Sequence, residues 1–284
     1  MLTTKTKVSL AALAYKFISF GRAIAGKDNT ATVRRGGMRW CLDLNEGIDF
    51  SIYLLGAFER STVASLEKLV KPGDVVLDIG ANVGAHTLGL ARSVGPGGRV
   101  YAFEPADFAF AKLQRNLALN PELDARTRAH QILLSATAAD PSQEQIYASW
   151  PLEQDDSVHP KHRGRLVTTR NATVDTLDRF AEREGVDRLH LIKIDVDGHE
   201  LPVLRGGLGL LERFRPVLLM EMSPYVHAEE HNSFAALVAL LRDAGYSLQH
   251  AGTWAPLPLD AGELEALIPD GASINVIARG VAKP

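Results

Sequence analysis

The chain of 284 residues has one cysteine, Cys41, and no apolar stretch that approaches the roughly 18 residues of a membrane-spanning helix. A single cysteine excludes disulfides within the chain and is consistent with a reducing, cytoplasmic environment. The formal net charge is only −3, so no basic excess indicates a nucleic-acid partner. Internal repeats and low-complexity segments are also lacking. We therefore predict one large α/β domain with a small N-terminal extension.

A short apolar segment that ends in a glycine-bounded loop lies near residue 80. Residues 75–79 predict a buried strand that contains Asp78, and a helical pattern follows over residues 85–94. The loop has the spacing Gly80-x-x-x-Gly84 and lacks the G-x-G-x-x-G of dinucleotide-binding folds. The Asp78 carboxylate would repel a diphosphate but suits a ligand that carries an ammonium and a sulfonium. We therefore predict S-adenosylmethionine as the cofactor and exclude NAD.

A second acidic residue supports the same cofactor. Residues 99–103 predict the next strand, and Glu104 and Pro105 follow it directly. Proline cannot continue a strand ladder, so the strand ends there. An acid at the tip of the second strand is where such folds bind the ribose hydroxyls. We therefore expect Glu104 to bind the ribose.

The rest of the chain alternates between strand and helix patterns. The predicted strands are residues 38–44, 128–134, 189–194, 216–222, 246–250 and 273–278, and the predicted helices are residues 50–70, 107–119, 175–184 (capped by Asp175) and 234–244. Residues 144–150 and 165–170 predict a hairpin around a polar loop. The pattern favours a Rossmann-like α/β fold, with a mostly parallel, seven-stranded sheet and helices on both faces. We assign residues 1–37 to an N-terminal helix and lead-in, and residues 38–284 to the main domain.

Residues 192–200 read Ile-Lys-Ile-Asp-Val-Asp-Gly-His-Glu. This run resembles the I-K-x-D-V-x-G-x-E pattern of the FkbM family of S-adenosylmethionine-dependent methyltransferases. The resemblance spans about residues 40–221, and it also includes Gly56, Glu59, the loop 78–84, Glu104, Pro105, Thr173, Asp175, Leu204, Arg205, Gly206 and Glu221. Departures from the family pattern are few, although the hairpin loop of residues 150–165 matches no part of it.

The resemblance implies a class I methyltransferase fold and an O-methyltransferase activity. The acceptor would be a small molecule or a glycan that offers a hydroxyl, such as a sugar, a glycolipid, a polysaccharide or a secondary metabolite. The cofactor-binding residues expected from the loop, the strand ends and the resemblance are Glu59, Asp78, Gly80, Ala81, Asn82, Gly84, Thr87, Glu104, Pro105, Ser135 and Asp195.

The candidate catalytic residues follow the fourth core strand. Lys193 and Asp195 are two residues apart, so they point to the same face of the strand. A lysine within an apolar strand must be paired, and its partner could be Asp195 or Glu221. The ion pair could be purely structural, or Lys193 could take a direct part in the chemistry. A base must accept the hydroxyl proton, and His199 has the most suitable ordinary pKa, about 6.5. Asp195 and Asp197 are the alternative bases.

The same acids also suit a second interpretation. Together with Glu200 and Glu221, the residues Asp195, Asp197 and His199 could build an oxygen-rich Mg²⁺ site. Such acids more often cap helices and accept hydrogen bonds, and Glu200 is expected to anchor the helix that follows it. We therefore assign no metal ligand and keep Mg²⁺ as a possible but not favoured cofactor.

The N-terminal segment is basic and amphipathic. The basic residues are Lys5, Lys7, Lys16, Arg22 and Lys27, and no acid precedes Asp28; Leu10, Leu13, Phe17, Phe20 and Ile24 recur at helical spacing. Such a helix can lie on an anionic membrane surface, which would make the cytoplasmic protein membrane-peripheral. Docking on its own domain, or on a second subunit in a homodimer, is the alternative.

Three other functions place different demands on the sequence. A nucleic-acid N-methyltransferase needs a [DNS]-P-P-[YF] motif after the fourth strand, and Ser223-Pro224-Tyr225 only partly resembles it and follows the fifth. An N-methyltransferase acting on a small molecule stays open. A catalytically silent cofactor-binding scaffold of a glycan-assembly complex also stays open, although the intact loop and the crowded acids argue against it.

Overall fold

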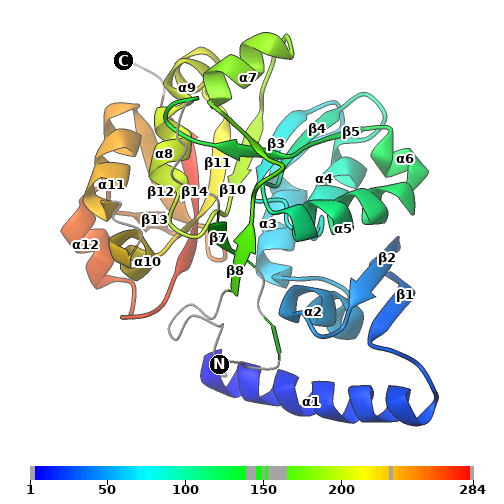
Figure 1. The fold of residues 1–284 in the computed structure, drawn as a ribbon. Helices are drawn as coiled ribbons and strands as arrows, with labels where there is room; N and C mark the ends of the chain where they lie inside the picture. Colours follow the sequence, from blue (N-terminus) through cyan, green and yellow to red (C-terminus); the bar gives the residue numbers. More distant parts are fainter. Residues whose placement is uncertain (1–3, 139–144, 149–150, 153–164, 230–232, 282–284) are drawn as a thin grey trace.

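A computed structural model describes residues 4–138, 145–148, 151–152, 165–229 and 233–281. Its centre is an eight-stranded sheet in the order β13-β12-β14-β11-β10-β3-β4-β5 (Figure 1). These strands are β3 (Val75–Ile79), β4 (Arg99–Phe103), β5 (Thr127–His130), β10 (Leu191–Ile194), β11 (Val217–Met222), β12 (Tyr246–His250), β13 (Pro256–Leu257) and β14 (Ile274–Gly280). Seven of these strands were predicted from the sequence, and the two-residue β13 extends the sheet at one edge. The predicted fold class is confirmed.

The direction of the strands follows the usual crossover rules. Strands β5, β4, β3, β10 and β11 are parallel neighbours, whereas β14 runs antiparallel between β11 and β12. Parallel strands joined by helical crossovers end at the same edge, so the loops after β3, β4 and β10 share one side of the sheet. This arrangement brings together segments that lie far apart in the sequence.

Helices cover both faces of this sheet (Figure 1). The helices from residue 47 onward are α2 (Gly47–Leu55), α3 (Arg60–Leu69), α4 (Thr87–Val94), α5 (Asp107–Ala118), α6 (Pro121–Asp124), α7 (Leu177–Arg183), α8 (Glu200–Arg205), α9 (Leu208–Phe214), α10 (Pro224–Glu229), α11 (Phe234–Asp243) and α12 (Ala261–Ala266). Alternate residues of β3 point to opposite faces of the sheet: Val76 belongs to the same core cluster as Leu90 of α4, and Leu77 to the same core cluster as Phe180 of α7. Burial on both faces explains why the core strands are almost wholly apolar.

Two predicted elements prove to be interrupted. The predicted helix over residues 50–70 is wrong as a single element, because Gly56 ends α2 in the left-handed region, with φ 83°. The predicted strand 128–134 also divides at Gln131, whose carbonyl oxygen already accepts from the Thr173 amide and whose side chain donates to Asp107. The part after Gln131, β6 (Ile132–Leu134), leaves the main sheet and pairs with β9 (Thr173–Asp175).

The start of α7 also differs from the prediction. The cap is Thr176, whose Oγ1 accepts a hydrogen bond from the Arg179 amide, rather than Asp175. Asp175 instead accepts from Arg183 and from the Thr176 amide. The predicted hairpin is confirmed, since β7 (Gln145–Ala148) pairs antiparallel with β8 (Arg165–Thr168); most of its polar loop, residues 153–164, lies outside the described residues.

The N-terminal part consists of a helix and a hairpin. Helix α1 (Thr4–Ile24) leads into β1 (Thr30–Arg35), which pairs antiparallel with β2 (Met38–Asp43), and the division expected between residues 37 and 38 lies in the turn of this hairpin. In Figure 1, α1 runs along the outside of the molecule beside α2. Within the described part of the chain, no helix is long and apolar enough to cross a membrane.

Gly206 offers a test of how tightly these layers fit. A Cβ at this position would lie 2.1 Å from the Ser135 carbonyl oxygen, a distance that real contacts do not reach. We expect Gly206→Ala to lower the free energy of unfolding by about 1–3 kcal/mol, because the end of α8 must move away from the loop after β6. Urea denaturation of the purified protein measures this change.

The matched control is Gly89→Ala within α4. A Cβ at Gly89 would meet no atom within 4 Å, so this variant should gain about 0.5–1 kcal/mol from the better helix propensity of alanine. Equal stability of the two variants would contradict the close contact between Gly206 and Ser135.

Candidate functional site

The loop after β3 depends on glycine at its first position. Gly80 has φ 76°, and a Cβ there would lie 1.8 Å from the Asp195 carbonyl oxygen. The amides of Gly80 and Ala81 both donate to the Phe103 carbonyl oxygen at the end of β4. Asn82 and Gly84 also have positive φ. The loop therefore lies directly against the ends of both neighbouring strands, β4 and β10.

Glu104 connects this loop to the segment after β4. One carboxylate oxygen, Oε2, accepts from the Asn82 amide at 2.8 Å, and the other, Oε1, accepts from the Ala106 amide at 2.9 Å. The side chain is buried, and burial raises its pKa to about 7 although the two hydrogen bonds act in the opposite direction. Each oxygen can accept a second hydrogen bond, so the carboxylate can still bind hydroxyls.

Lys193 lies at the centre of the site. Its Nζ donates to the Gly80 carbonyl oxygen at 3.0 Å and lies 3.3 Å from Asp78 Oδ1 and 3.5 Å from Asp195 Oδ2. Burial alone would lower the pKa of Lys193, but the charges of Asp78 and Asp195 outweigh burial and raise it. The lysine therefore stays charged and ties the loop of residues 80–84, the candidate cofactor loop, to the end of β10.

The predicted pairing of Lys193 with Asp195 is confirmed, and the pairing with Glu221 is wrong. Glu221 instead accepts a hydrogen bond from Ser273, on the segment before β14. The partner that the sequence did not indicate is Asp78, which faces Lys193 across adjacent strands in the same register. Lys193 supplies the counter-charge of Asp78, and Thr87 Oγ1 donates a hydrogen bond to Asp78 Oδ2 at 2.6 Å.

Several acids gather around Asp195. Burial, followed by the charge of Asp195, raises the pKa values of Glu59 and Glu221 above their ordinary range. Burial, the charge of Asp195 and that of Glu200 raise the pKa of Asp197 to about 8. Asp197 also has an unusual backbone, with φ 47°. These acids give the region a negative potential. Asp197, with a pKa of about 8, stays mostly protonated at neutral pH.

Glu200 holds the turn that carries these acids. It is buried at the start of α8, and its Oε1 lies 3.4 Å from the amides of both Val196 and Gly198. Glu200 was expected to anchor the helix that follows it. In the structure, its carboxylate also lies against the backbone amides of the turn that precedes this helix. Its other oxygen lies 3.3 Å from Nε2 of the buried His227. Burial raises the pKa of Glu200 to about 7 and lowers that of His227 to about 4.

The remaining predicted residues occupy distinct places. His199 is partly buried at the residue before α8. Glu59 precedes α3 with φ 44° and accepts from Thr62 Oγ1 at 3.0 Å. Ser135 is buried after β6, and its amide donates to the Asp175 carbonyl oxygen. Pro105 is buried directly after Glu104.

The sequence did not single out His86. Its side chain is buried, its Nε2 lies 3.9 Å from Glu59 Oε2, and burial lowers its pKa to about 4. A single histidine within a loop has no distinguishing pattern, so only the fold places it beside Glu59. As for metals, no cluster of three or more potential ligands is found among the residues that the structure describes.

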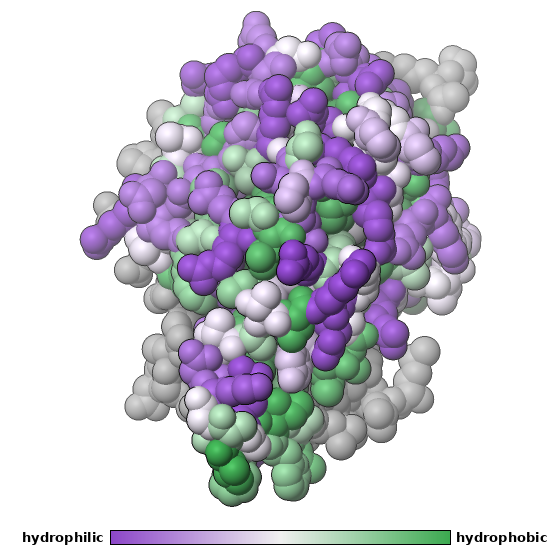
Figure 2. Space-filling model, turned by 90° about the vertical axis from the view of Figure 1, so that its right-hand side faces the viewer, coloured by the Kyte–Doolittle hydropathy of each residue, from purple (hydrophilic) through white to green (hydrophobic). Residues whose placement is uncertain are grey.

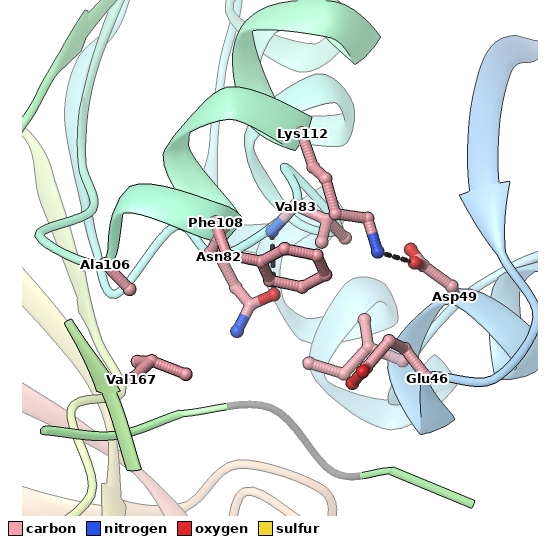
Figure 3. A pocket seen from close by; sticks show the side chains of 10 residues that line it. Glu46, Asp49, Asn82, Val83, Ala106, Phe108, Lys112 and Val167 are labelled. Atoms are coloured by element: carbon pink, nitrogen blue, oxygen red, sulfur yellow. Dashed lines mark hydrogen bonds and ion pairs between the residues drawn. The ribbon is translucent and has the colours of Figure 1, made fainter. Parts of the chain in front are cut away.

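A pocket beside the cofactor loop was also not predicted (Figure 3). It is lined by Glu46, Ile48, Asp49, Asn82, Val83, Ala106, Phe108, Ala109, Lys112 and Val167. Lys112 of α5 and Asp49 of α2 form an ion pair in its wall, and burial raises the pKa of Asp49 to about 6 despite that cation. The two residues are 63 positions apart, and no motif joins them.

The strand order, the glycine loop after β3 and the acids at the ends of β4 and β10 define the fold of class I methyltransferases. The chain matches the methyltransferase FkbM domain over residues 78–248, more than half of its length. It therefore belongs to the FkbM methyltransferase family.

Named relatives share part of this chain. The 31-O-demethyl-FK506 methyltransferase FkbM of Streptomyces tacrolimicus is 30% identical over 205 residues, 63% of this chain and 75% of that protein. Methyltransferase 1 of Beauveria bassiana is 32% identical over 145 residues, 46% of this chain and 57% of that protein. The hexuronic acid methyltransferase AglP of Haloferax volcanii is 26% identical over 163 residues, 57% of this chain and 61% of that protein.

The match thus covers less than two thirds of the length of the Beauveria and Haloferax proteins. Among solved structures, the methyltransferase FkbM of Methylobacillus flagellatus aligns with a TM-score of 0.43 and 18% identity, over 76% of this chain and 50% of that chain.

The buried acids and histidines predict how stability depends on pH. Raised pKa values of Glu104, Asp197 and Glu200 mean that the folded protein holds protons that the unfolded chain releases, so stability falls as pH rises through about 7 to 8. The lowered pKa values of His86 and His227 act in the opposite direction. Below about pH 6.5 the unfolded chain binds protons that these buried histidines do not bind, so stability gains no further from acidification. Each proton contributes at most about 1.4 kcal/mol per pH unit.

We therefore expect the cofactor-free protein to be more stable at pH 6.5 than at pH 8.5. Urea denaturation at constant ionic strength measures this difference. Glu200→Gln should flatten the dependence, whereas the exposed control Glu212→Gln should not. Stability that increases steadily from pH 6.5 to pH 8.5 would contradict the raised carboxyl pKa values.

Proposed function

We propose that the protein is an S-adenosylmethionine-dependent O-methyltransferase that acts on a hydroxyl of a sugar-containing molecule or a secondary metabolite. The observation that carries this proposal is the contact of Lys193 with both the Gly80 carbonyl oxygen and Asp195. Through that contact the loop that would hold the cofactor and the turn that would receive the acceptor form one unit. Names of two relatives, a hexuronic acid methyltransferase and a 31-O-demethyl-FK506 methyltransferase, support an oxygen acceptor.

The residues present suit this cofactor. Glu104 keeps hydrogen-bonding capacity for ribose hydroxyls, and the absence of a Cβ at Gly80 lets the loop pack directly against the Asp195 carbonyl oxygen after β10. The acids around Asp195 favour a ligand with cationic groups, as the ammonium and sulfonium of this cofactor are. When bound, S-adenosylmethionine supplies an activated methyl group, so that the protein's task is mainly to position the acceptor and to accept its proton.

We assign the base to Asp197, which lies on the turn after β10, two residues from Asp195. With a pKa of about 8, the ionised form of this carboxylate binds a proton more strongly than an ordinary aspartate does, which favours proton transfer from a hydroxyl. Asp195 is already in contact with Lys193, which suits it to position the turn and to face the cofactor's positive charge. His199, on the same turn, is the alternative base, and Lys193 acts as a positioning residue.

The cofactor assignment can be tested by calorimetry. We expect the purified protein to bind S-adenosylhomocysteine and not NAD. Glu104→Ala should weaken that binding by about 1.5–3 kcal/mol for each ribose hydrogen bond lost. Because Glu104 also holds two backbone amides, a 2′-deoxy analogue of S-adenosylhomocysteine serves as the control.

If Glu104 binds the ribose, the substitution should cost less affinity for the deoxy analogue than for the parent ligand. An equal loss for both ligands would limit Glu104 to its structural role. Tight binding of NAD would overturn the cofactor assignment.

The chemistry can be tested without knowing the acceptor. Extracts of a host that lacks the gene contain the unmethylated acceptor, so incorporation of a labelled methyl group from S-adenosylmethionine measures turnover. Asp197→Asn should lower the rate by about 10²–10⁴-fold and remove the acidic limb of the pH profile, with little change in cofactor affinity. Asp195→Asn should also lower the rate.

His199→Ala should keep the acidic limb if Asp197 is the base. Loss of the limb in His199→Ala alone would assign the base to His199. Unchanged rates in all three variants would move the active site elsewhere. Cofactor binding without any labelled product would favour the scaffold alternative, and mass spectrometry of the product identifies the methylated group.

A further inference from the structure

Helix α1 has one face that is fixed to its own protein. Tyr15 is buried and packs edge-to-face on Phe50 of α2, with 5.8 Å between the ring centroids. Ser19 donates to the Asn29 side chain at 2.9 Å. Arg22 donates to two backbone carbonyl oxygens in the segment that leads into β1. These contacts fix the rotation of α1 about its axis. Because its guanidinium already binds the protein's own backbone, Arg22 is not counted among the charges that could bind a partner.

The opposite face carries large apolar side chains that contact little. Leu13, Phe17, Phe20 and Ile24 are 53%, 70%, 68% and 73% exposed and recur every three or four residues, which places them on one side of the helix. We call these four residues the apolar stripe. Figure 2 shows apolar atoms gathered at the lower end of the molecule, where α1 lies. A contiguous group of this kind marks a contact surface, because isolated apolar residues are common but rows of them are not.

Positive charge accompanies the stripe. Lys16 and Lys27 are exposed, and the sequence adds Lys5 and Lys7 to the same N-terminal segment, with no acid before Asp28. A second copy of α1 packed on the stripe would bring these like charges together without opposing acids. An anionic lipid surface instead offers a counter-charge for the lysines and an apolar layer for the stripe.

We propose that α1 docks the protein on an anionic membrane surface, with the apolar stripe inserted among the lipid headgroups and Lys16 beside them. The helix lies in the plane of the surface, since no described helix is suited to crossing a membrane. The proposal concerns α1 alone and holds whatever reaction the protein catalyses.

Sedimentation with vesicles tests this proposal on the full chain. The protein should sediment with vesicles of phosphatidylcholine and phosphatidylglycerol at low salt, much less at high salt, and not with phosphatidylcholine alone. Phe17→Asp with Phe20→Asp should leave the protein in the supernatant. Lys16→Glu should lower the partition coefficient by about fivefold or more, the effect of one basic residue near an anionic surface.

Leu208→Asp is the matched control, because Leu208 is also exposed (48%) but lies on α9, at the far end of the molecule from α1 (Figure 1). This variant should bind vesicles like the wild type, and thermal unfolding should be unchanged in all variants because the altered side chains are exposed. Wild-type protein that stays in the supernatant at low salt would overturn the proposal. So would a dimer, measured by light scattering, that the double substitution converts to a monomer while vesicles bind neither form.

Discussion

The buried ammonium of Lys193 is the constraint on which the site depends. A charge inside a sheet is tolerated only when it is paired, and removal of one partner from such a pair typically costs about 3–5 kcal/mol. Asp78, Asp195 and the Gly80 carbonyl oxygen together satisfy Lys193, and they come from strand β3, the turn after β10 and the loop after β3. The cofactor loop and the turn after β10 therefore keep a fixed relative position because both are held by the same nitrogen atom.

One cation among many acids has a further consequence. Lys193 and the hydrogen bond from Thr87 stabilise Asp78, but Glu59, Asp197 and Glu221 have no buried cation of their own in the described structure. These acids keep raised pKa values, so their charges depend on what binds nearby. A cationic cofactor would lower those pKa values on binding, so that more of these acids would be ionised and able to accept a proton in the complex than in the free protein.

Local patterns predicted those parts of the fold and site that depend on neighbouring residues. The strands follow from short apolar runs, and the loop after β3 follows from its glycine spacing. The pairing of Lys193 with Asp195 follows from their two-residue separation along one strand. The break at Gln131, the buried His86 and the pocket with Asp49 and Lys112 could not be predicted. Each of these depends on a contact between distant segments, and such contacts leave no period in the sequence.

The N-terminal helix is joined to the site by a short series of contacts. Tyr15 of α1 packs on Phe50 of α2. Asp49, the residue before Phe50, pairs with Lys112 of α5. Helix α5 begins three residues after Glu104, whose carboxylate holds the cofactor loop. Packed interiors transmit position because they have few voids. A surface that binds the outer face of α1 would therefore also fix the height and orientation of the pocket beside the cofactor loop, so that an acceptor held at that surface would meet the site in a constant geometry.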